Sequence, residues 1–270
     1  MTLPPVPADP LFSARVHGGG PTRVIAVHGW MAASDLFEPL IEHLDVDKLS
    51  VCFPDCRGYG MRRAVHGAMT IEEIASDVLA LADSLGWSRF HVLGHSMAGM
   101  AAQRLMVDAP GRLQSAVLLA PVPATGARVD DVRRRSLLAA ITDPSARLAL
   151  IDDNTGGARD REWLDRVRHL SLAGTEPGAM ERYLASWSGP GFARELEGNV
   201  VPASVVIGRL DPGTPEAEVR VTFRRLLANV RFDVLDGVGH YAMQEEPAML
   251  VGAMTRHFEH VSESAASNRS

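Results

Sequence analysis

A serine between two small residues is the strongest chemical signal in this sequence. Ser96 lies in the segment Gly94–Gly99 (GHSMAG), after an apolar run and before a helical pattern. A serine that projects from a tight turn between a strand and a helix needs small residues two positions away on both sides. Gly94 and Ala98 meet that need. Because the first turn of a helix also favours developing negative charge, the segment predicts a nucleophilic serine suited to acyl transfer.

A base and an acid that can activate this serine follow it along the chain. His240 ends the glycine-rich loop GVGH, and Asp211 lies in GRLDP at the end of the preceding apolar run. Taken alone, His240 fits a loop histidine bonded to backbone, and Asp211 fits an Asp-Pro turn. Asp236, just before the GVGH loop, is the rival acid. The order serine, aspartate, histidine, each after a strand, is an order known for catalytic triads, so we predict Ser96, Asp211 and His240 as catalytic residues.

Acyl transfer also needs donors for the oxyanion of the tetrahedral intermediate. The backbone N–H of Met97, the residue after the nucleophile, is the first predicted donor. The second is the backbone N–H of Trp30, in the segment His28-Gly29-Trp30 after an early apolar run. Gly29 allows the chain to turn there, and His28 is expected to bond loop backbone and take no part in the reaction.

The elements that must position these residues appear as alternating patterns. Short, nearly continuous apolar runs alternate with longer helical stretches, which is typical of a parallel sheet with both faces covered. The predicted strands occupy residues 22–29, 49–55, 90–96, 113–121, 203–211 and 230–237. The sequence therefore predicts an α/β fold with a mostly parallel central sheet flanked by helices.

Several helix boundaries are marked by residue type. Thr70 is predicted to cap a helix, with Glu73 at the capping-box position and Gly86 at the end. Another helix is expected directly after Ser96. The last is expected from Gln244 to His260, followed by a polar tail, residues 262–270, that frays.

One long segment interrupts the alternation. Residues 122–197 contain no convincing strand, only amphipathic patterns at 130–142, 161–174 and 177–188, and proline and glycine mark both ends. We predict residues 1–121 and 198–270 as the α/β core and residues 122–197 as a helical insertion large enough to cover one end of the sheet. The basic run Arg133–Arg135 is expected on a solvated helix face.

Composition excludes several function classes. The net charge of −6 argues against nucleic-acid binding, and no apolar run is long enough to cross a bilayer. The N-terminal stretch MTLPPVPADPLF does not resemble a secretory signal. Cys52 and Cys56 lack a second Cys/His pair and are expected as free thiols, which favours a cytoplasmic protein. No His/Cys/Asp cluster has metal-ligand spacing and no Gly-x-Gly-x-x-Gly motif follows a strand, so we expect no metal or organic cofactor. Whether the chain forms a homodimer is left open.

The segments named above resemble the α/β-hydrolase esterase/lipase superfamily, and the HGW form resembles small bacterial aryl esterases. Matching stretches are HGW, DCRGYG (residues 55–60), GHSMAG, GRLDPGTP (208–215) and GVGHYAMQEEP (237–247). The resemblance implies that residues 122–197 are a cap over the active site. Haloalkane dehalogenases and epoxide hydrolases are disfavoured, because these enzymes carry aspartate in place of Ser96. Plant hydroxynitrile lyases use a cap lysine, which residues 122–197 lack.

The expected activity is hydrolysis of a small to medium, largely apolar carboxylic ester, a small-molecule substrate, through an acyl-enzyme. A lactonase, a hydrolase of carbon–carbon bonds in β-diketone-like compounds and a non-catalytic binding protein remain as alternatives. The predicted substrate contacts come from the HGW loop, the cap and the loop after the histidine: Trp30, Trp163, Tyr183, Trp187, Tyr241 and Met243.

Overall fold

The computed structural model describes residues 9–267 and contains a seven-stranded sheet in the order β1-β3-β2-β4-β5-β6-β7. The strands are β1 (Val16–His17), β2 (Thr22–Val27), β3 (Leu49–Cys52), β4 (Phe90–His95), β5 (Leu113–Leu119), β6 (Ala203–Gly208) and β7 (Val230–Leu235). All neighbouring pairs are parallel except β1 and β3. The predicted mostly parallel sheet is confirmed. β1 was not predicted, because two residues are too few to form a recognisable pattern.

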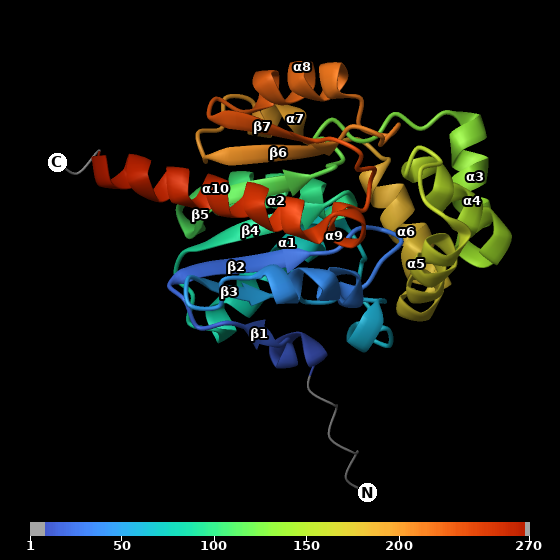
Figure 1. Ribbon diagram of the computed structural model, residues 1–270, viewed down its shortest axis with the longest axis horizontal. Helices are drawn as coiled ribbons and strands as arrows, with labels where there is room; N and C mark the ends of the chain where they lie inside the picture. The colour runs from blue at the N-terminus through green and yellow to red at the C-terminus, as the bar shows by residue number, and fades with distance from the viewer. Residues whose placement is uncertain (1–8, 268–270) are drawn as a thin grey trace, which may run out of the picture.

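Helices cover both faces of the sheet (Figure 1). They are α1 (Ile71–Ser84), α2 (Met97–Asp108), α8 (Glu216–Leu226), α9 (Ala242–Glu245) and α10 (Pro247–Ser267), with short 3₁₀ segments η1 (Pro10–Ser13), η2 (Ser34–His43), η3 (Gly60–Arg62) and η4 (Pro110–Arg112). α1 packs on α2, and α2 packs on β4 and β5, while α10 crosses the front of the sheet beside η2. Covered on both faces, β4 is buried along its whole length, which explains its continuous apolar pattern.

The start of α1 follows the prediction only in part. Thr70 Oγ1 accepts a hydrogen bond from Glu73 N at 3.2 Å, as a capping residue should. The Glu73 carboxylate, however, accepts from Ala68 N at 3.2 Å and Met69 N at 2.7 Å instead of from Thr70 N. Met69 has a left-handed φ of 57°, so the chain turns before the cap and presents these earlier amides to Glu73.

The C-terminal helix differs from the prediction at both ends. Instead of one helix over 244–260, α9 ends at Glu245 and α10 begins at Pro247. Glu246 between them is not helical, with φ −146° and ψ 69°, because a residue before proline avoids helical geometry. The predicted fraying is wrong for residues 262–267, which continue α10. Residues 268–270 of that tail, and residues 1–8 of the stretch tested for a signal, lie outside the described range.

The segment between β5 and β6 is helical, with no strand among its residues, all of which the structure describes. It contains α3 (Asp131–Thr142), α4 (Pro144–Asn154), α5 (Arg161–Gly174), α6 (Pro177–Trp187) and α7 (Ala193–Leu196), and Figure 1 shows α3–α6 gathered at one end of the sheet. The three predicted helices correspond to α3, α5 and α6, and the prediction missed α4 and α7. Arg134 and Arg135 are exposed on α3, and Arg133 pairs with Asp153.

One buried arginine joins three of these helices. The Arg147 side chain of α4, only 1% exposed, donates to Ala140 O at 2.6 Å and Ile141 O at 2.8 Å near the end of α3. It also donates to Ser171 O and to Thr175 Oγ1 at the end of α5, and it contacts Met180 Sδ of α6. The last carbonyls of a helix carry partial negative charge and lack partners within the helix. Arg147 therefore satisfies two helix ends at once, and they balance its charge.

Candidate active site

Ser96 occupies a strained turn between β4 and α2. Its backbone has φ 54° and ψ −113°, a region that non-glycine residues rarely adopt. The turn is fixed by hydrogen bonds from Ser96 N to Leu119 O at 2.9 Å and from Val122 N to Ser96 O at 3.0 Å. A Cβ added at Gly94 would overlap the Ala98 carbonyl, so only glycine fits there. The turn leaves the Ser96 side chain half-buried at the start of a helix.

His240 and Asp211 meet although 29 residues separate them. His240 Nδ1 lies 2.6 Å from Asp211 Oδ2, and the Asp211 side chain is fully buried. Gly213 N and Thr214 Oγ1 each donate to the same carboxylate at 2.8 Å. Burial alone would raise the pKa of Asp211, but His240 and these donors hold it below its ordinary value of 3.8. The carboxylate therefore stays ionised beside the imidazole.

The rival acid lies elsewhere. Asp236 is 78% exposed at its side chain and pairs with Arg209. Asp211 is therefore the carboxylate that the fold brings to His240. Because an ionised carboxylate only accepts hydrogen bonds, the proton of neutral His240 is assigned to Nδ1, which leaves Nε2 free to act as a base.

His95 connects the histidine to the serine turn. His95 Nε2 is 3.0 Å from His240 O, and the two imidazole rings have centroids 4.8 Å apart. His95 directly precedes Ser96, so Ser96 and His240 lie on adjoining backbone. No hydrogen bond joins Ser96 Oγ to His240 within the described residues, and such bonds often tighten only when substrate binds. Burial, reinforced by His240, keeps the pKa of His95 far below its ordinary value, so His95 is neutral.

The loop predicted to supply the second oxyanion donor passes directly against Ser96. A Cβ added at Gly29 would lie 3.1 Å from Ser96 Cβ. His28 Nδ1 is 2.9 Å from Gly29 O, while Cys56 N donates to His28 Nε2 at 3.0 Å. In a trans peptide the carbonyl and the following N–H point in opposite directions, so holding Gly29 O toward His28 turns the Trp30 N–H away from it. The predicted structural role of His28 is confirmed.

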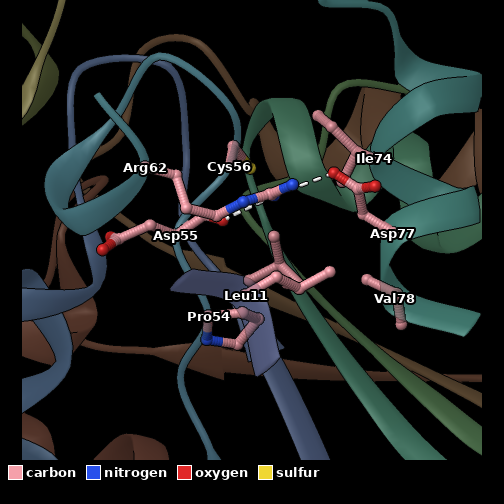
Figure 2. Close-up of a pocket in the computed structure, with 9 residues that line it drawn as sticks. Leu11, Pro54, Asp55, Cys56, Arg62, Ile74, Asp77 and Val78 are labelled. Atoms are coloured by element: carbon pink, nitrogen blue, oxygen red, sulfur yellow. Dashed lines mark hydrogen bonds and ion pairs between the residues drawn. The ribbon is translucent and has the colours of Figure 1, made fainter. Parts of the chain in front are cut away.

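A buried arginine supports the neighbouring loop that contains Asp55 and Cys56 (Figure 2). Arg62 is 1% exposed, pairs with Asp9 and Asp77 at 2.8 Å each, and donates to Asp55 O at 3.1 Å. The adjoining cavity has a volume of only about 10 Å³, room for roughly one water molecule. Figure 2 shows the guanidinium directed across this space toward Asp77 of α1. Arg62 therefore fixes the backbone at Asp55, next to Cys56, whose N–H donates to His28. The sequence had given Arg62 no role.

Helix α6 holds the side chain of Trp30. Trp30 Nε1 donates to Met180 O at 2.8 Å, and its ring meets the edge of Trp187 at a centroid distance of 5.8 Å. Trp187 is 7% exposed, and its buried Nε1 has no hydrogen-bond partner among the described residues. Tyr183 is 1% exposed and packs on Tyr59, with ring centroids 5.6 Å apart. Trp187 thus adjoins the loop that carries Trp30, whereas the surroundings of Tyr183 are those of a packing residue.

The remaining predicted contacts surround the loop after His240. Tyr241 meets His240 edge-on at a centroid distance of 5.3 Å and is 2% exposed. Trp163 is half-buried, lies 6.3 Å from the Tyr241 ring and donates through Nε1 to Gln244 O at 3.3 Å. Met243 is fully buried. The fold brings Trp163 to Tyr241, which in turn lies against His240. Contact of Trp163, Tyr241 and Met243 with substrate stays a prediction.

Sequence reasoning missed a buried acid beside the histidine. Glu245 has no exposed side-chain surface and bonds backbone amides next to His240. The signal in the sequence was its position: Glu245 lies one helical turn after Tyr241, on the side of the apolar stretch Tyr241–Met243, which is expected to be buried.

Residues 9–267 contain neither a candidate membrane-spanning helix nor a candidate metal cluster. In this range no helix is both long and apolar enough to cross a membrane. No group of three or more His, Cys, Asp or Glu side chains in the same range could hold a metal ion. Cys52 and Cys56 are buried and unpaired, as predicted.

Comparison with known proteins places these features in context. A sequence model described as the alpha/beta hydrolase fold matches residues 22–247. The chain is 34% identical over 105 residues to the dihydrolipoyllysine-residue acetyltransferase component of the acetoin cleaving system of Cupriavidus necator, covering 39% of this chain. It is 33% identical over 123 residues to the lipase LipV of Mycobacterium tuberculosis, covering 45% of this chain.

The two curated matches are partial, because they span 28% and 46% of those proteins. A solved hydrolase of Oleispira antarctica matches with a TM-score of 0.81 at 15% identity, over 92% of this chain and 94% of that one. At that identity the likeness concerns the fold, and it extends over nearly the whole described chain.

Proposed function

The chain belongs to the alpha/beta hydrolase fold family, and from that membership we propose that it is a serine esterase for small to medium, largely apolar carboxylic esters. The hydrogen bond between His240 Nδ1 and the buried Asp211 carboxylate, on backbone adjoining the strained Ser96 turn, carries the proposal. A histidine with its proton fixed on Nδ1 offers Nε2 as a general base, and a serine is a weak nucleophile without one.

The proposed reaction has two acyl-transfer steps. His240 Nε2 takes the Ser96 hydroxyl proton as Oγ attacks the ester carbonyl carbon, and Asp211 stabilises the imidazolium. The Met97 and Trp30 amides donate to the oxyanion. The C–O bond to the alcohol breaks as His240 returns the proton to the leaving oxygen, which leaves Ser96 acylated. A water molecule then gives a proton to His240 and attacks the acyl carbon, and Ser96 leaves with that proton.

The two neighbouring histidines have different proposed roles. His95 is fully buried and neutral, and its Nε2–H donates to the His240 carbonyl. Its Nδ1 has no hydrogen-bond partner among the described residues, so no carboxylate would stabilise the imidazolium formed if His95 took the serine proton. His240 is half-buried and has its carboxylate partner on the opposite ring nitrogen. The proton transfer is therefore assigned to His240 alone.

We further propose that residues 122–197 act as a cap domain on a core formed by residues 1–121 and 198–270. Helix α6 supports this, because it contacts the side chain of Trp30 through Met180 and Trp187. The indole rings of Trp30 and Trp187 meet edge to face, and the apolar surface that they form favours an apolar acyl or alcohol group beside them. A cap in this position would form one wall of the pocket and exclude water.

The test is a substrate panel with a matched inactive variant. Purified protein is assayed against p-nitrophenyl esters of increasing acyl length, several lactones and a β-diketone, alongside Ser96→Ala. We expect turnover of at least one ester series and stoichiometric labelling of the wild type by a fluorophosphonate, both lost in Ser96→Ala. Preference for a lactone or the diketone would reassign the substrate class, whereas equal rates for wild type and Ser96→Ala would reject a serine hydrolase.

A further inference from the structure

A single buried carboxylate holds the backbone on both sides of His240. Glu245 Oε2 accepts a hydrogen bond from Gly239 N, and Glu245 Oε1 accepts one from Tyr241 N, each at 2.8 Å. The Glu245 side chain has no exposed surface. A carboxylate that accepts from charged or backbone donors forms strong, short hydrogen bonds. Both amides that flank the histidine are therefore fixed by one side chain.

An arginine from the helical segment completes this arrangement. Arg159, between α4 and α5, lies 3.0 Å from Glu245 Oε2 through Nε and 2.9 Å through Nη2. Its Nη2 also donates to Gly237 O, three residues before His240. A buried carboxylate without a partner is strongly unfavourable, and Arg159 supplies the partner that Glu245 needs. The histidine loop is thus bonded to Glu245 and, at Gly237, to Arg159 itself.

The same helical segment also contacts the histidine loop through its backbone. His240 N donates to Asn154 O at 2.9 Å, at the end of α4. A Cβ added at Gly239 would lie 2.6 Å from Thr155 Cα, so the two backbones are in close contact. Between this segment and Glu245, the loop has little freedom to shift.

We infer that Glu245 and Arg159 are positioning residues for His240, an inference that rests on the proposed serine esterase activity. Asp211 restrains the imidazole at Nδ1 only, and the ring can still pivot about that bond if its backbone moves. Glu245 fixes the backbone, and Arg159 fixes Glu245. The two restraints together define where Nε2 lies relative to Ser96. A displacement of about 1 Å in such a group lowers the rate by roughly 100-fold.

The experiment compares variants that differ in this contact alone. Glu245→Gln keeps the size of the side chain but turns an amide N–H₂ toward one of the two backbone N–H groups. Arg159→Met removes the cation from the cap side, and Arg159→Lys restores the charge as a rescue. Arg161→Met is the matched control, because Arg161 belongs to the same segment and pairs with Asp165 while 69% exposed. Each is assayed for kcat and KM on the best ester, with circular dichroism to verify folding.

We expect Glu245→Gln and Arg159→Met to lower kcat by about 10- to 100-fold while KM changes less than about threefold, because orientation and not binding is lost. Arg159→Lys should recover part of the rate, and Arg161→Met should match wild type. In hydrogen exchange, the amides of Gly239 and Tyr241 should exchange faster in Arg159→Met than in Arg161→Met.

Several outcomes would overturn the inference. If kcat in both variants equals that of the control while only thermal stability falls, Glu245 is structural and positions nothing. Unchanged amide exchange in Arg159→Met would likewise refute the link from the cap. If Glu245→Gln does not fold, Arg159→Met decides. Failure of the proposed function has a different signature, since wild type and Ser96→Ala would then hydrolyse the esters equally while the exchange difference persisted.

Discussion

Replacing Asp211 by asparagine tests the proposed acid of the triad. The substitution exchanges one carboxylate oxygen for an N–H₂ group with almost no change of shape. Asp211 Oδ2 faces His240 Nδ1 and the Thr214 hydroxyl, while Oδ1 faces Gly213 N. Asparagine has one oxygen and one N–H₂ group for these two positions. The fold decides which way the amide turns.

The Gly213 N–H can only donate, so it requires the amide oxygen at the Oδ1 position. The Thr214 hydroxyl can rotate and accept from the N–H₂ group at the Oδ2 position. This orientation satisfies both groups, and it directs an N–H at His240 Nδ1. The reverse orientation opposes two buried donors, which costs about 1–3 kcal/mol. Asp211→Asn should therefore hold His240 as its Nε2–H tautomer, with no base facing Ser96. We expect kcat to fall by about 10⁴.

The assay is steady-state hydrolysis of the best p-nitrophenyl ester, with circular dichroism to verify that the variant folds. Asp236→Asn is the matched control, because Asp236 is exposed and pairs with Arg209. It should keep activity within about twofold of wild type, as surface changes usually do. The reasoning fails if Asp211→Asn retains more than about a tenth of the wild-type kcat, or if Asp236→Asn loses more.

Four further expectations follow from the same contacts. Ser96→Ala and His240→Ala should each lower kcat by roughly 10⁴–10⁶, with the double variant hardly worse, because the triad acts as a unit; additive losses in steady-state assays would contradict this. Since the folded-state pKa of Asp211 lies below 3.8, its contribution to stability is present above that pH and lost as pH falls through the folded value. Thermal melts from about pH 5 to pH 2 should therefore fall more steeply in wild type than in Asp211→Asn, and equal slopes would count against an ionised buried carboxylate. Arg147→Met leaves several buried carbonyls without donors and should lower the free energy of unfolding by about 3 kcal/mol or more, as urea denaturation would measure. Trp187→Ala should change relative kcat/KM between short and long acyl chains by about 1–3 kcal/mol, and an unchanged profile with a lower Tm would make Trp187 a packing residue.

The fold could be predicted from the sequence because its signals are local. The buried parallel strands are nearly continuous apolar runs. All six strands from β2 to β7 were predicted, although β7 at the sheet edge alternates apolar and charged residues and is mostly half-buried. The two-residue β1 carries no pattern. The break between α9 and α10 was overlooked although Pro247 marks it, because the apolar spacing continues across the proline. Helix α4 was missed because its large apolar residues lie in one short run, residues 148–151, with no repeat that marks a helix face.

The candidate triad was also predictable, for a related reason. In a parallel sheet the residues that follow the strands meet at one edge, so chain order and position after a strand suffice to bring Asp211 to His240. The choice between Asp211 and Asp236 needed coordinates, since both lie near the end of an apolar run. Only the fold shows that one is buried against the imidazole and the other is paired with Arg209 in solvent.

The sequence by itself determined the fold class, the serine turn and the loops that carry His240 and Asp211, because each depends on residues close together in the chain. The supporting contacts were decided by tertiary structure alone. Arg159 and Glu245 are 86 residues apart, and Arg62 and Asp9 are 53 apart. With 27 Lys and Arg and 33 Asp and Glu in the chain, no local pattern selects which charges become partners. That selection is made by packing, which excludes water from a few pairs and leaves the rest exposed.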